Sequence, residues 1–138
     1  MRFENTLSFM SKMKDTSSVL DKVALLEGTD EITRRVLYWT YNTYKQFHLG
    51  VDNLKKRKDL TSTTCAYEDL FDLLAALDAR VITGHEAIAQ TNAFIRDNPD
   101  IEDLVNLILD RNLKIRASVK LINRACDNLI PTFDVALA

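Results

Sequence analysis

The sequence contains few of the residues that interrupt regular secondary structure, with 3 glycines and 2 prolines in 138 residues. An all-β domain needs a turn about every 8 to 12 residues, and this chain lacks the residues for so many turns. No apolar run approaches the roughly 20 residues that a membrane-spanning helix needs, so a membrane is not an expected partner. These absences favour a helical protein.

Cysteine and histidine are also scarce, with two residues of each type. Cys65, Cys126, His48 and His85 form no pair at the spacing of a metal site, so we expect no bound metal. The amino terminus carries an acid at Glu4 and no apolar run, which is not typical of a secretory leader. Reduced thiols in a cytoplasmic protein are therefore expected.

The sequence motifs of common enzymes are missing as well. There is no Gly-x-x-x-x-Gly-Lys phosphate loop, no Gly-x-Gly-x-x-Gly and no Gly-x-Ser-x-Gly. The carboxylates of residues 68–110 are spread along predicted helices, where solvated faces explain them better than acid and base pairs. We expect no catalytic residue in this chain.

The chain is 46% hydrophobic and 28% charged, which is enough apolar material for the core of one domain spanning residues 1–138. Asp30, Asn98 and either Ser17 or Ser18 are expected as N-caps, Pro99 as a first helical residue, and residues 51–65 as an exposed loop. The predicted fold is all-α, a compact bundle of about seven helices. The helical period places them at residues 3–10, 18–27, 30–48, 68–80, 85–96, 98–109 and 118–127.

The aromatic residues of the third predicted helix have two interpretations. Tyr38, Trp39, Tyr41 and Tyr44 could stack on nucleic-acid bases. Trp39 shares a predicted face with Ile32 and Val36, however, and we expect it to pack in the core. Tyr38 and Tyr41 are assigned to no ligand.

The net charge of −2 conceals a strong separation of charge along the sequence. Residues 59–110 carry 11 acidic and two basic residues, whereas residues 111–126 carry five basic residues and no acid. Such polarity is typical of a protein that meets a charged partner. The basic segment comprises Arg111, Lys114, Arg116, Lys120 and Arg124, which could share one exposed surface. A second group, Lys55, Lys56, Arg57 and Lys58, is either a solvated loop or a nucleic-acid contact.

Two predicted helix starts could bind phosphate through free backbone N–H groups. Thr83, Gly84 and His85 open one helix, and the alternative there is an ordinary N-cap at Thr83 with Glu86 completing a capping box. Ser118 begins the last helix, in more basic surroundings. If both starts lie on one face, they provide paired phosphate sites.

Three segments resemble the amino-terminal DNA-binding domain of ATP-dependent DNA ligases, closest to those of T-even bacteriophages. The likeness is good from about residue 80 to 138, weaker over residues 16–48, and absent in the loop at 51–65. The segments are Arg80-Val-Ile-Thr-Gly-His-Glu-Ala, Leu109-Asp-Arg-Asn-Leu-Lys-Ile-Arg-Ala-Ser-Val and Ile122-Asn-Arg-Ala-Cys-Asp-Asn-Leu-Ile-Pro131.

The resemblance implies an all-helical domain that grips duplex DNA across the minor groove on both sides of a nick, mainly through phosphates and sugars. The chain departs from the family at Arg116, where glycine is common, and at Asp127 and Asn128, where Pro-Gly is common. By position, the implied phosphate contacts are Thr83, Gly84, Lys114, Arg116, Ala117 and Ser118.

Ligases adenylate a lysine in a Lys-x-Asp-Gly motif, which this sequence does not contain. The chain is therefore expected to be a monomeric domain fragment, or a stand-alone relic of one, that binds double-stranded or nicked DNA without sealing it. ATP, Mg²⁺ and a following nucleotidyltransferase domain belong to the expected parent ligase, in the host cytoplasm if a phage encodes it. The alternative is a helical interaction adaptor whose acidic face, residues 68–110, meets a basic partner.

Overall fold

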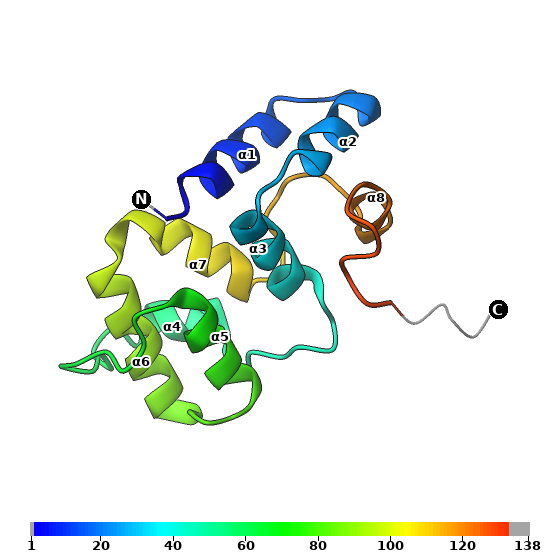
Figure 1. The fold of residues 1–138 in the computed structure, drawn as a ribbon. Helices are drawn as coiled ribbons and strands as arrows, with labels where there is room; N and C mark the ends of the chain where they lie inside the picture. Colours follow the sequence, from blue (N-terminus) through cyan, green and yellow to red (C-terminus); the bar gives the residue numbers. More distant parts are fainter. Residues whose placement is uncertain (1, 133–138) are drawn as a thin grey trace. The chain divides into compact units, whose positions relative to one another are not determined.

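The computed structural model describes residues 2–132, and every regular element in that range is helical (Figure 1). The all-α prediction is confirmed, whereas the ligase-like arrangement of the helices stays a prediction. The described residues form eight α-helices and one 3-10 helix: α1 (Glu4–Lys14), α2 (Val19–Glu27), α3 (Glu31–Tyr41), α4 (Val51–Lys56), α5 (Leu70–Asp78), α6 (Gly84–Asp97), η1 (Pro99–Ile101), α7 (Glu102–Leu109) and α8 (Val119–Ala125).

The chain divides into two compact units. The first unit combines Met1–Tyr44 with Arg111–Ala138, and its described part contains α1, α2, α3 and α8. The second unit is Lys45–Asp110, with α4, α5, α6, η1 and α7. The prediction of a single domain over residues 1–138 stays a prediction.

In the first unit, α8 packs beside α2, although the two helices are almost 100 residues apart in the sequence (Figure 1). Helix α1 packs on both α2 and α3. The hydroxyls of Thr6 and Thr33 join α1 to α3 through a buried hydrogen bond of 2.8 Å. Fully buried Met13 and Leu26 contribute to the same core. This core is what positions the residues that follow position 110.

The buried face of α3 differs from the predicted one. Thr33, Val36 and Leu37 are buried, whereas Trp39 is only half-buried and its ring meets Tyr38 edge-on at 6.1 Å. The expectation of a core tryptophan was wrong because the buried face of α3 is shifted by one residue from the predicted face. Two threonines, Thr33 and Thr40, occupy positions that apolar residues would ordinarily take, so the apolar pattern pointed elsewhere.

Helix α3 ends at Tyr41 rather than near His48. Asn42 is buried and extended, with ψ of 107°, and its side-chain oxygen accepts a hydrogen bond from Tyr44 N at 2.9 Å. An asparagine that bonds the backbone two residues ahead competes with the helix, which therefore stops there. No glycine or proline before Gly50 signals this end.

In the second unit, α6 packs against α4 and α5. The predicted loop at 51–65 was wrong in its first half, because residues 51–56 form α4 with Val51 and Leu54 buried. The following residues are fastened to α6, since the buried Asn92 amide donates to the carbonyls of Arg57 and Leu60 at 3.1 and 3.0 Å. Four polar residues in a six-residue helix gave the sequence too weak a period to reveal it.

Three of the expected N-caps occur. The side chains of Ser18, Asp30 and Ser118 accept hydrogen bonds from the backbone N–H three residues ahead. Asn98 occupies the N-cap position of η1 as expected, but its side chain makes no capping bond, because its amide donates back to the carbonyl of Phe94 at 2.9 Å. Pro99 does begin the 3-10 helix η1, as expected.

Replacing Asp30 with alanine should lower the free energy of unfolding by about 1 kcal/mol at neutral pH, since it removes a cap and the bond from Asn5. Hydrogen bonds from Thr33, and secondarily from Asn5, hold the pKa of Asp30 below its ordinary value. Because the pKa of Asp30 is lower in the folded than in the unfolded protein, its ionised carboxylate stabilises the fold at every pH above the ordinary pKa of about 4. This stabilisation is lost as the pH falls through the lowered pKa.

Urea unfolding of the wild type and Asp30→Ala at about pH 7 and about pH 2.5 measures this difference. The gap between the two proteins should shrink at acid pH. Glu68→Ala removes an exposed acid outside any helix and serves as the control, expected within about 0.5 kcal/mol of wild type at both values. A gap for Asp30→Ala that widens at acid pH contradicts the assignment.

Candidate nucleic-acid interface

The predicted site residues fall equally on the two units. Arg111, Lys114, Arg116, Ala117, Ser118, Lys120 and Arg124 belong to the first unit, and Lys55, Lys56, Arg57, Lys58, Thr83, Gly84 and His85 to the second. Twelve of them are exposed, and Arg111 and Ala117 are half-buried. The name basic segment is used below for residues 111–124.

The first part of the basic segment alternates between buried and exposed side chains. Leu113 and Ile115 are buried, at 1% and 0% exposure, whereas Lys114 and Arg116 are exposed. The burial of these two apolar side chains holds this stretch of backbone against the core of the unit. As a result the two cationic side chains project into solvent.

Three basic residues of this stretch have left-handed backbone conformations. The φ angles of Arg111, Lys114 and Arg116 are 63°, 58° and 56°. Non-glycine residues pay about 1 kcal/mol or more for this conformation, which persists only where the surroundings impose it. Contacts with neighbouring parts of the unit therefore hold the loop in this conformation.

Helices α2 and α3 provide these constraints. The Arg111 guanidinium donates to the carbonyl of Asn42, and the N–H of Leu113 donates to the Tyr41 hydroxyl oxygen at 3.1 Å. The ammonium of Lys22 in α2 donates to the carbonyl of Arg116 at 3.1 Å. Burial raises the pKa of Tyr41, the bond from Leu113 opposing it, so the hydroxyl stays neutral at ordinary pH.

The sequence analysis did not predict a supporting role for Lys22, Tyr41 or Asn42. Lys22 lies four residues before the core residue Leu26, on the same helix face, and is 9% exposed. A lysine at a buried helical position was the available signal. Its partner, Arg116, is 94 residues away, which no local pattern reveals.

Helix α8 continues the basic segment. Lys120 and Arg124 are exposed one helical turn apart, while Ile122 between them is fully buried. The Ser118 hydroxyl already accepts from Leu121 N at 3.1 Å, so it caps the helix itself, and Ala117 is half-buried. Within the described residues, Lys114, Arg116, Lys120 and Arg124 form no ion pair.

The turn after α8 is fixed by Asn123. Its amide donates to the carbonyl of Ile130 at 2.9 Å, and its oxygen accepts from Ile130 N at 2.7 Å. Asp127 and Asn128, between them, are both left-handed, with φ of 51° and 59°. The reciprocal bond explains how two non-glycine residues are kept in that conformation.

In the second unit, the start of α6 is open. Thr83 makes no side-chain cap, and the Glu86 carboxylate accepts from the amide of Gln90 at 3.0 Å, so the capping-box alternative is wrong. Gly84 has φ of +54°, and a Cβ added there would meet nothing within 4 Å. Thr83, Gly84 and His85 are all exposed, leaving the first N–H groups of α6 accessible.

The group 55–58 is partly neutralised and lies elsewhere on this unit. Arg57 pairs with Asp59 through two hydrogen bonds, at 3.0 and 3.1 Å, and Lys58 pairs with Glu102 at 3.6 Å. The carbonyl of Arg57 meets Asn92, which is about 12 Å along α6 from Gly84. The structure therefore does not bring this group to the start of α6.

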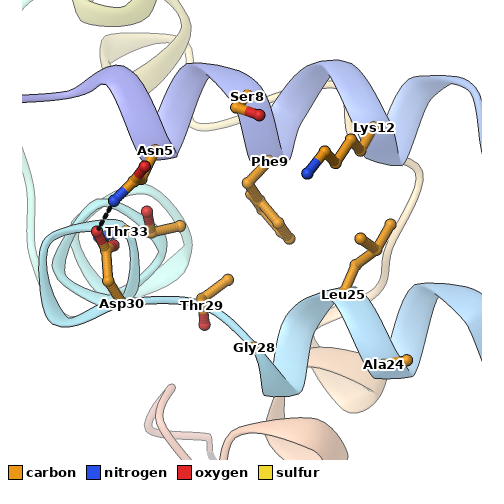
Figure 2. Close-up of a pocket in the computed structure, with 10 residues that line it drawn as sticks. All are labelled: Asn5, Ser8, Phe9, Lys12, Ala24, Leu25, Gly28, Thr29, Asp30 and Thr33. Atoms are coloured by element: carbon orange, nitrogen blue, oxygen red, sulfur yellow. Dashed lines mark hydrogen bonds between the residues drawn. The ribbon is translucent and has the colours of Figure 1, made fainter.

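A groove of about 390 Å³ lies between α1, α2 and the start of α3 (Figure 2). Its acid, Asp30, is bonded to Asn5 and to Thr33 N, and Lys12 is its one cationic residue. Phe9 and Leu25 form much of the remaining lining. The groove lacks both the clustered cations of a phosphate site and the paired titratable groups of a catalytic one.

Over residues 2–132, no cluster of three histidine, cysteine or acidic side chains could hold a metal ion. In that range, no helix has the length and apolar character to cross a bilayer. Neither a protein-family model nor a curated protein matches this sequence. The residues themselves must carry the functional argument.

The left-handed φ at position 116 predicts an inverted ranking of two substitutions. Arg116→Gly should be more stable than Arg116→Ala by about 1 kcal/mol, because glycine adopts this conformation without strain. Denaturant unfolding measures it, with Lys120→Gly and Lys120→Ala in α8 as the matched pair. At position 120, the alanine variant should be more stable than the glycine variant by about 1 kcal/mol. Alanine winning at both positions would mean that residue 116 is not left-handed in solution.

Proposed function

We propose that this chain binds duplex DNA without sequence preference, favours nicked DNA, and positions the catalytic domain of an ATP-dependent DNA ligase. The basic segment is the main binding surface in this proposal. The start of α6 provides a second contact with the phosphate backbone. ATP, Mg²⁺ and the adenylated lysine belong to the parent enzyme, so the chain does not seal nicks.

One observation carries the proposal: four exposed cationic side chains in an eleven-residue stretch, Lys114, Arg116, Lys120 and Arg124, without an ion-paired acid among the described residues. Unpaired cations on a fixed backbone release counterions when they meet phosphates, which is the main source of sequence-independent affinity. Phosphate contacts position a protein without reading bases. An enzyme that acts at nicks of any sequence needs this kind of contact.

The backbone supports the ligase resemblance at two places. Ligase DNA-binding domains often have glycine where this chain has Arg116, and Arg116 adopts the left-handed conformation that glycine favours. Asn128, which stands where glycine is common, is also left-handed, within a turn that Asn123 braces. Asp127 does not fit the pattern, because it is left-handed where proline is common and proline cannot adopt that conformation. The arginine would then supply a side-chain contact in place of a close backbone approach.

The start of α6 adds a feature suited to an anion. Gly84 leaves open space beside the helix start, and the Thr83 hydroxyl is not used as a cap. Free N–H groups at the positive end of a 14-residue helix attract a phosphate. Lys55 and Lys56 are exposed, but they lie toward the other end of α6 and have a smaller role in the proposal.

The direct test is the anisotropy of a labelled nicked duplex titrated with the full chain. If about four phosphates are neutralised, the affinity should fall about 10²-fold between about 50 and 200 mM salt. Lys114→Glu/Arg116→Glu should weaken binding at least about tenfold on every sequence and reduce the salt slope by about 2. An intact duplex of the same sequence measures the preference for the nick.

Lys12→Glu/Lys14→Glu is the matched control, since it changes the charge equally on exposed residues of α1 outside the basic segment. Its salt slope should stay close to that of wild type. No binding by the wild-type chain at micromolar concentration would contradict the proposal and favour the adaptor with an acidic face. A loss confined to certain sequences would indicate base reading.

A further inference from the structure

The first turn of α2 reverses the usual rule for burial. Val19 and Leu20 are 57% and 77% exposed, whereas Lys22 of the same helix is 9% exposed. Burying an ammonium is costly unless it is hydrogen-bonded, and lysine normally extends its charged end into water. A helix that exposes leucine and buries lysine therefore indicates a specific partner for the lysine.

That partner is the carbonyl of Arg116, which accepts from Lys22 Nζ at 3.1 Å. Arg116 is left-handed, so its backbone conformation is unfavourable without outside support. The bond acts on the Arg116 peptide directly, whereas Tyr41 and Asn42 accept hydrogen bonds from Leu113 and Arg111. Among the described residues, Lys22 is the side chain that fixes this peptide.

The burial of neighbouring residues completes the geometry. Ile115 is fully buried on one side of the Arg116 peptide, and Ser118 caps α8 on the other. With its carbonyl turned toward Lys22, Arg116 has an exposed side chain. Releasing the carbonyl would let this residue relax to right-handed conformations and redirect its guanidinium.

We propose that Lys22 is a positioning residue, whose ammonium holds the carbonyl of Arg116 and so fixes the direction in which Arg116 meets DNA. Lys22 itself does not contact the nucleic acid. The effect on DNA affinity rests on the proposed function above. The effect on the loop does not, so the two can be tested separately.

Trypsin cleavage tests the loop without DNA, because the enzyme cuts after lysine and arginine. Lys22→Met keeps a similar volume but loses the charged donor. It should accelerate cleavage after Lys114 and Arg116 about five- to tenfold, relative to cleavage after Lys56 in the second unit, because cleavage tracks the open population. Lys14→Met, an exposed lysine changed in the same way, should leave the ratio unchanged.

Lys22→Arg retains a charged donor and should return the ratio toward the wild-type value. Equal acceleration at all sites in Lys22→Met would make Lys22 a general stabilising residue and would overturn the proposal. So would an unchanged ratio in a folded Lys22→Met protein. If Lys22→Met does not fold, Lys22→Leu, which also has no donor, replaces it with the same expected outcomes.

A double-mutant cycle tests the consequence for DNA. Lys22→Met should weaken binding to nicked duplex about three- to tenfold in the wild-type background, and less than about twofold when Arg116 is already glutamine. Equal losses in both backgrounds would mean that Lys22 acts independently of Arg116. If the wild-type chain does not bind DNA, the proposed function fails, and the cleavage ratio still decides whether Lys22 positions the loop.

Discussion

The hydrogen bond between Lys22 and the carbonyl of Arg116 joins α2 to a peptide 94 residues later, and the shape of the basic segment depends on such long-range bonds. Three left-handed basic residues lie within six positions, and each is unfavourable in isolation. Donors and acceptors from α2 and α3, together with buried Leu113 and Ile115, compensate for this cost. Local preference would give this stretch a different conformation.

This dependence explains which parts of the fold the sequence could predict. The caps at Ser18, Asp30 and Ser118 are local interactions over three residues, and the sequence predicted Asp30, Ser118 and one of Ser17 and Ser18. The end of α3 was missed because it depends on the buried environment of Asn42. Helix α4 was missed because two apolar residues suffice once Asn92 fastens the chain that follows.

For the candidate site, the sequence predicted composition better than geometry. The clustering of cations at residues 111–124 is visible in the one-dimensional charge pattern, and four of the five side chains are exposed. The left-handed backbone was not predictable, since no glycine marks it and its supports lie in α2 and α3. For the start of α6, the sequence allowed either an ordinary N-cap or an anion site. The Thr83 hydroxyl makes no capping hydrogen bond, so the N-cap alternative was wrong.

Lysine footprinting on bound nicked duplex tests the central claim most directly, namely that the basic segment is the surface that meets DNA. An amine-reactive reagent labels exposed lysines, and mass spectrometry compares each one with and without DNA. The account predicts strong protection of Lys114 and Lys120, with Lys12 and Lys14 of α1 unchanged. Binding that leaves Lys114 and Lys120 as reactive as in the free protein would contradict it.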